Sequence, residues 1–225
     1  MKTTTCLLLA LICCTTAYAG IEGITILSES HHVSGTATGT TQSDSYDLTQ
    51  STSVTGSASA LWQVDDEFYP GPNPGTNEVS SSAGNFSVTA TDNSCWAFTG
   101  SEALAESTYT FTPLVTDLQF NYTGNVEMQA EENAVSVTIE DITNGQTIDT
   151  RLWTTGLSSG LSINENLYYT FDLTHEYELK LYAKVEARGN PGVTSAIDVA
   201  ITPEPATLAL LAIGILLFKR KRVAH

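Results

Sequence analysis

The chain has 225 residues, and its 25 acidic side chains outnumber nine basic ones, for a formal net charge of −16 at pH 7. All of the acidic residues lie between residues 20 and 218, where only Arg151, Lys180, Lys184 and Arg188 are basic. Such a surface repels the phosphate backbone of DNA or RNA, so the composition argues against any nucleic-acid partner.

The first 19 residues have the pattern of a secretory signal peptide. Lys2 provides the positive charge, residues 6–14 form an apolar run, and Ala17 and Ala19 are the small residues that a signal peptidase requires. We therefore expect cleavage after Ala19 and export of the mature chain. Three of the four cysteines would leave with this segment, so the mature chain would retain only Cys95 and form no internal disulfide.

Residues 20–201 are rich in Thr, Ser, Gly, Val and Tyr and alternate between apolar and polar side chains, as β-strands do. In chain order, this alternation predicts strands at residues 24–27, 57–64, 86–90, 108–113, 118–122, 135–139 and 168–173. Residues 102–106 are compatible instead with a helical turn, for which Thr99 and Glu102 would form a capping box. The proline-rich segment 70–75 cannot lie inside a sheet.

Two hairpins are expected in the second half of the chain. Asn144-Gly145 is a strong signal for a two-residue type I′ turn, which would pair Ile139 with Thr150 and bring Arg151 diagonally near Glu140. Every second residue of segment 177–187 is apolar, and the same alternation resumes at 193–201 after a turn. These two segments are predicted to pair as an antiparallel hairpin with one face in solvent.

Many short strands, frequent turn signals and almost no helix predict the fold class. We expect an all-β domain over residues 20–201, an antiparallel β-sandwich of the jelly-roll kind. The domain would stand between the signal peptide at residues 1–19 and a sorting segment at residues 202–225.

The C-terminal segment has three parts in a fixed order. Pro203-Glu204-Pro205 comes first, and an uncharged apolar run follows at residues 208–218. The run is shorter than the ~20 residues of an ordinary spanning helix, but snorkelling side chains and local thinning of the bilayer make a short transmembrane helix feasible. A basic quartet behind the run would hold that end on the cytoplasmic side and stop the chain in the membrane: Lys219, Arg220, Lys221 and Arg222.

This order resembles the PEP-CTERM sorting signal of Gram-negative bacteria, and the resemblance covers residues 202–222. It differs in two minor points, since Thr202 stands where valine is common and the apolar run is short. The resemblance implies that an exosortase, a membrane-embedded cysteine protease, reads the tripeptide. It also implies a place in the cell envelope and a link to exopolysaccharide, with the N-terminal domain outside the cytoplasm and release to the cell surface or matrix after processing.

The sequence does not support a cysteine-protease site. Residues 93–98 resemble the nucleophile segment of papain-type proteases, with Cys95 as the nucleophile, but they lack the glycine and second cysteine of that family. The catalytic histidine would have to be His225, which lies beyond the anchor, whereas His175 is too close in sequence and is expected in a turn. We therefore predict no catalytic residues and no enzymatic activity.

Other candidate sites are weak. Adjacent histidines on a strand, such as His31 and His32, point to opposite faces and make a poor metal site. Acidic groups could ligate Ca²⁺, but their spacing matches no EF-hand and such groups are expected by chance in so acidic a chain. We predict no metal and no cofactor; the acidic groups are Asp65-Asp66-Glu67 with Glu78, and Glu131-Glu132.

Two functions from different classes remain open. The first is a structural or adhesive envelope protein, and the second is a carbohydrate-binding module for exopolysaccharide. Trp62, Trp96 and Trp153 would either stack on sugars or fill the core. Two or more exposed, coplanar aromatic rings on one face would favour the module.

Overall fold

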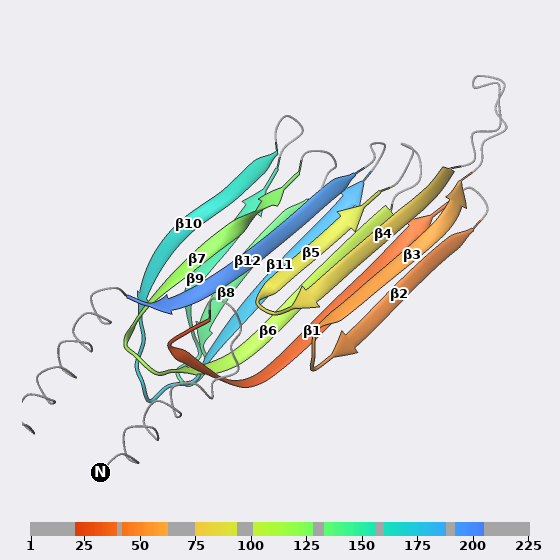
Figure 1. Cartoon of the computed structure of the whole chain (residues 1–225). Helices are drawn as coiled ribbons and strands as arrows, with labels where there is room; N and C mark the ends of the chain where they lie inside the picture. Colours follow the sequence, from red (N-terminus) through yellow and green to blue (C-terminus); the bar gives the residue numbers. More distant parts are fainter. Residues whose placement is uncertain are drawn as a thin grey trace, which may run out of the picture.

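The computed structural model describes residues 21–39, 42–62, 75–93, 101–127, 133–155, 160–187 and 192–204. Within these ranges the chain forms β-strands and no helix, in two six-stranded antiparallel sheets that pack face to face (Figure 1). The all-β, antiparallel class predicted from the sequence is therefore confirmed.

One sheet has the strand order β2-β1-β6-β11-β8-β9, and the other has the order β10-β7-β12-β5-β4-β3. The first sheet contains β1 (Ile24–Thr38), β2 (Ser43–Gln50), β6 (Ser101–Pro113), β8 (Ala134–Asp141), β9 (Gln146–Thr154) and β11 (Tyr177–Ala187). The second contains β3 (Val54–Trp62), β4 (Gly75–Gly84), β5 (Ser87–Asp92), β7 (Asp117–Val126), β10 (Leu161–Thr170) and β12 (Val193–Pro203).

The core lies between the sheets, because the long strands bury every second side chain. Small side chains fill one corner, where alanines of β3 and β4 face those of β1 and β6. Aromatic rings gather at the end of the sandwich where β6 and β12 finish, and each touches at least one other ring of the group: Phe111, Phe120, Tyr169, Phe171 and Tyr177. This aromatic cluster supports the end from which the C-terminal segment leaves.

The hairpin around Asn144 is present, but its predicted register is wrong. Its strands pair Asp141 with Gln146, so the turn holds four residues rather than two, and a bulge shifts the ladder after Ile139. Arg151 consequently binds Asp149 at 2.9 Å instead of approaching Glu140. The side chain of Asp141 accepts the N–H of Asn144 at 3.1 Å, and this contact stabilises the longer turn.

The predicted pairing of segments 177–187 and 193–201 is also wrong. Both segments are strands with one buried face, but β11 lies in one sheet and β12 in the other. A buried face can be covered across the core as well as within a hairpin, and the alternation of a single strand does not distinguish these arrangements.

Residues 102–106 belong to β6 and form no helical turn. Ala103 and Ala105 are buried, whereas Glu102, Leu104 and Glu106 face outward, which is the period of a strand. The described residues contain no helix long and apolar enough to cross a membrane. The predicted signal peptide, the apolar run at 208–218 and the basic quartet lie outside the described residues.

Candidate functional site

The first two residues of the Pro-Glu-Pro tripeptide lie at one end of the folded sandwich. Pro203 is the last residue of β12, where it pairs with Leu118 of β7 and is buried. The N–H of Glu204 donates to the carbonyl of Asp117 at 3.2 Å, so the pairing extends one residue further. The tripeptide is thus extended at its start, a conformation that proline and the residue before it favour, and its backbone there is paired with β7. Pro205 lies outside the described residues.

The other edge of β12 is covered at this point by residues 21–23, which we call the N-terminal clasp. β5 pairs with β12 only as far as Asp198, and Ile21 then forms a parallel bridge with Ile201. The N–H of Glu22 donates to the carbonyl of Ile201 at 2.7 Å. The end of β12 therefore has a neighbour on both sides.

Gly23 allows the clasp to lie against the tripeptide. Its φ of +82° belongs to the left-handed region that favours glycine. A Cβ at this position would stand 2.7 Å from the side chain of Leu118 and 3.2 Å from that of Pro203. The carbonyl of Gly23 also accepts the N–H of Leu114 at 2.8 Å, which fixes the clasp to the loop after β6. The alternation of apolar and polar residues in the sequence does not indicate this packing.

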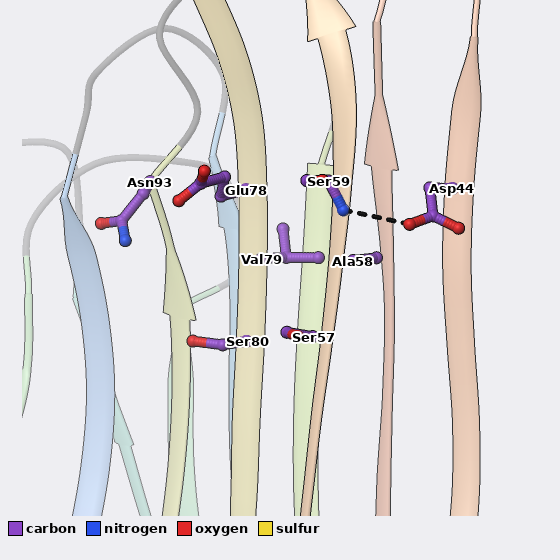
Figure 2. A pocket seen from close by; sticks show the side chains of 8 residues that line it. All are labelled: Asp44, Ser57, Ala58, Ser59, Glu78, Val79, Ser80 and Asn93. Atoms are coloured by element: carbon purple, nitrogen blue, oxygen red, sulfur yellow. Dashed lines mark hydrogen bonds between the residues drawn. The ribbon is translucent and has the colours of Figure 1, made fainter.

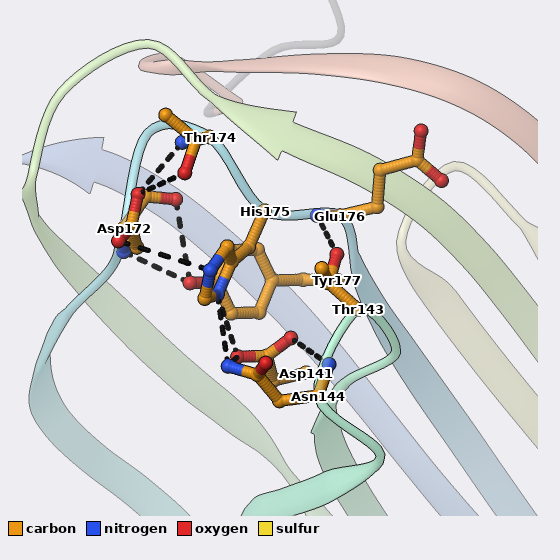
Figure 3. A network of polar contacts seen from close by, with 8 residues as sticks. All are labelled: Asp141, Thr143, Asn144, Asp172, Thr174, His175, Glu176 and Tyr177. Carbon is orange, nitrogen blue, oxygen red and sulfur yellow. Dashed lines mark hydrogen bonds and ion pairs between the residues drawn. The ribbon is translucent and has the colours of Figure 1, made fainter.

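A polar network lies near the β8–β9 turn, and Figure 3 shows Asp141, Asn144 and Asp172 around the imidazole ring of His175. The Nδ1 atom of His175 lies 2.8 Å from Asp141, and the N–H of Glu176 donates to the hydroxyl of Thr143 at 2.9 Å. Burial alone would raise the pKa of Asp141, but hydrogen bonds from Asn144 and His175 outweigh it and lower that pKa. His175 lies in a turn, as predicted, within the loop that precedes β11. The network connects this loop to the β8–β9 turn at residues 142–145.

His31 and His32 point to opposite faces of β1, as predicted. His31 is buried, with its Nδ1 atom 3.0 Å from the hydroxyl of Ser107 and its Nε2 atom 3.7 Å from the carboxylate of Glu29. These are the residue types of a nucleophile–base–acid triad, but Ser107 is only 1% exposed, so a substrate cannot reach its hydroxyl. The arrangement is a buried polar contact between β1 and β6.

Among the residues that the structure describes, no group of three or more His, Cys, Asp or Glu side chains is placed to hold a metal ion. Glu78, one of the residues considered for calcium, lies on β4. Cys95, Asp65-Asp66-Glu67 and Glu131-Glu132 lie outside the described residues.

Glu78 is part of a shallow polar groove of about 320 Å³ (Figure 2). In this groove the carboxylate of Asp44 accepts the N–H of Ser59 at 3.2 Å, so a side chain from β2 satisfies an exposed edge of β3. The groove offers hydroxyl, carboxyl and amide groups and no aromatic ring; its lining residues are Asp44, Ser57, Ala58, Ser59, Glu78, Val79, Ser80 and Asn93.

The aromatic side chains in the described residues mostly fill the core. Trp153 is 8% exposed, and its indole N–H donates to Glu165 at 3.0 Å. Tyr168 is the aromatic side chain that stands out, at 56% exposed, among those whose burial is described. These residues therefore provide no pair of exposed rings on one face. Trp96 lies outside the described residues.

The structure thus defines an acidic β-sandwich whose last strand continues directly into a C-terminal sorting segment. Residues 202–223 match the family described as the PEP-CTERM protein-sorting motif. The chain therefore carries a PEP-CTERM sorting motif, as its sequence predicted. No curated protein matches the chain.

Two solved structures show a weak likeness. TmCBM61 in complex with β-1,4-galactotriose is 10% identical, with 67% of this chain and 88% of that chain covered and a TM-score of 0.27. The enzymatically active domain of tailspike protein 4 from bacteriophage CBA120 is 12% identical, with 77% and 19% covered and a TM-score of 0.27. Neither likeness is close enough to support a function.

Proposed function

We propose that this chain is an exported cell-envelope protein that an exosortase-type membrane protease processes at its C-terminal motif. The observation that carries the proposal is the sorting motif at residues 202–223, whose first two residues are the last two of β12. In this proposal the signal peptide is removed after Ala19, and the apolar run with its basic quartet anchors the chain until processing. The sandwich lies outside the cytoplasm throughout.

The sandwich itself would have a structural or adhesive role without catalytic turnover. Its Ser107 and His31 are buried and contact each other inside the core. Its acidic surface would keep it soluble outside the cell. Because the described aromatic rings form no exposed platform, we favour this role over sugar binding by stacking. Cys95 would be dispensable, so Cys95→Ser should leave delivery unchanged.

The test is fractionation of the producing cells with mass analysis of both ends of the mature chain. Since Pro203 is part of the sheet, its replacement would disturb folding as well as recognition, and Glu204→Gln with Pro205→Ala is the cleaner variant. This variant should remain anchored and unprocessed, whereas a Thr202→Val control should be processed like the wild type. Neutral residues in place of the basic quartet should loosen membrane retention.

Processing of the Glu204→Gln, Pro205→Ala variant at the wild-type rate would mean that the tripeptide is not the recognised element. An unprocessed wild-type chain, or one that still begins at Met1 in the envelope fraction, would overturn the proposal as well.

A further inference from the structure

The tripeptide begins inside the fold, so an enzyme that binds it must compete with the contacts of the folded domain. Enzymes that take an extended peptide pair with its backbone and place its side chains in pockets. At the end of β12 that backbone is already engaged, because Glu22 binds the carbonyl of Ile201 and Asp117 binds the N–H of Glu204. The ring of Pro203 is buried beside Gly23 and Leu118.

We propose that the folded sandwich keeps the sorting tripeptide inaccessible, and that the processing enzyme binds the tripeptide only after residues 201–204 detach from β7 and the clasp. This inference rests on the proposed function, whose enzyme it concerns. Sub-global opening of this kind is common at the ends of strands, where few contacts have to break. The enzyme would act on the open fraction, so the rate of processing would follow the opening equilibrium.

The clasp joins the first residues of the described domain to the end of its last strand, β12. It begins at the second residue after the predicted cleavage site, and its contacts include Ile201, Leu118 and Pro203. A weaker clasp should raise the open fraction in proportion, and a tenfold faster rate corresponds to about 1.4 kcal/mol of lost clasp stability.

A reversible lock tests the proposal in the full-length chain. Thr202 and Gln119 are cross-strand partners at the end of β12, and both side chains are on the outer face of the sheet. Directly opposite residues of an antiparallel pair lie within the Cα separation that a disulfide spans. Thr202→Cys with Gln119→Cys, in a Cys95→Ser background, should therefore close the end of β12 in the oxidising envelope.

The matched control is Ala196→Cys with Asn125→Cys, which joins the same two strands six residues before Thr202 and on the same face. We expect the oxidised lock at residue 202 to accumulate unprocessed and to be processed after a reductant is added. The oxidised control should be processed at the wild-type rate. Pulse labelling and mass analysis of the C-terminus give the rates.

A variant that weakens the clasp should have the opposite effect on the rate of processing. Glu22→Pro removes the N–H that binds Ile201, whereas Glu22→Gln keeps it. Glu22→Pro should be processed several-fold faster than the wild type, and Glu22→Gln at the same rate.

Processing of the oxidised lock at the wild-type rate, or equal inhibition by the control disulfide, would overturn the clasp proposal. So would equal rates for Glu22→Pro and Glu22→Gln. These results leave the proposed function standing, because that function fails on other outcomes: processing of the Glu204→Gln, Pro205→Ala variant, an unprocessed wild-type chain, or a chain that still begins at Met1 in the envelope fraction.

Discussion

The ring of Phe86 lies flat on the ring of Tyr109, with 4.0 Å between their centroids and 8° between their planes. The backbone N–H of Phe86 donates to the hydroxyl of Tyr109 at 2.7 Å. Phe86 lies in the β4–β5 turn with φ of +56°, a conformation that costs a bulky L-residue about 1–2 kcal/mol. Because Tyr109 belongs to β6 in the opposite sheet, the strained turn is held by a contact that also joins the two sheets.

Removal of the Tyr109 hydroxyl should destabilise the fold. In Tyr109→Phe the buried N–H of Phe86 loses its acceptor, and we expect the free energy of unfolding to fall by about 1–3 kcal/mol. Tyr168→Phe is the control, since that tyrosine is 56% exposed and its change should stay within about 0.5 kcal/mol. Urea unfolding followed by tryptophan fluorescence measures both; equal midpoints would contradict the role given to the hydroxyl.

The stability of the protein should depend on pH through His31. Burial lowers the pKa of His31, an effect that the nearby Glu29 only partly offsets. The unfolded chain then binds more protons than the folded one below about pH 6.5, so His31 destabilises the fold as the pH falls through that value. His31→Asn keeps a partner for Ser107 and should lose less stability than the wild type between pH 7.5 and pH 5. Parallel stability curves would refute this assignment.

His32 should give the opposite dependence, although it is the next residue in the chain. Burial alone would lower the pKa of His32, but hydrogen bonds to Glu106 at 3.0 Å and Asp47 at 3.1 Å outweigh it and raise that pKa. Its contribution is therefore fully present below about pH 6.5 and is lost as the pH rises through the raised folded-state value. His32→Gln should remove this contribution.

An NMR titration of the two imidazole rings tests both assignments directly. The ring resonance that disappears in His32→Gln should titrate above the ordinary histidine value, and the one that disappears in His31→Asn should titrate below it. The reverse order would contradict the geometry of β1.

The sequence predicted the strands with regular alternation well. The apolar positions of segment 177–187 are buried through Val185, and those of 193–201 are buried as expected. It missed β2 and β4, which are rich in Ser, Asp, Asn and Gly and have few apolar residues to alternate. Alternation shows that a strand has one buried face, but it does not show which sheet the strand joins.

Only the local part of the candidate site could be predicted from the sequence. The Pro-Glu-Pro motif is local and was visible in the sequence, and its family match confirms it. The burial of Pro203 depends on residues 21–23, which lie 180 to 182 positions earlier in the chain. It also depends on Gly23, whose positive φ has meaning only once Leu118 and Pro203 are in place. Contacts of that sequence separation leave no pattern in a single chain.

Tyr46 of β2 and Gly56 of β3 lie in contact between the two sheets, and this contact can be tested by mutation. Tyr46 of β2 covers Gly35 and Gly56, and its hydroxyl lies 2.7 Å from that of Ser81. A Cβ at Gly56 would overlap the ring of Tyr46, so Gly56→Ala should destabilise the protein by about 1–3 kcal/mol through overpacking. In a Tyr46→Ala background the ring is gone, and the same change should cost little. The double-mutant cycle, measured by urea unfolding, should therefore show a coupling energy of about 1 kcal/mol or more, whereas additive effects would mean that Tyr46 does not pack on Gly56.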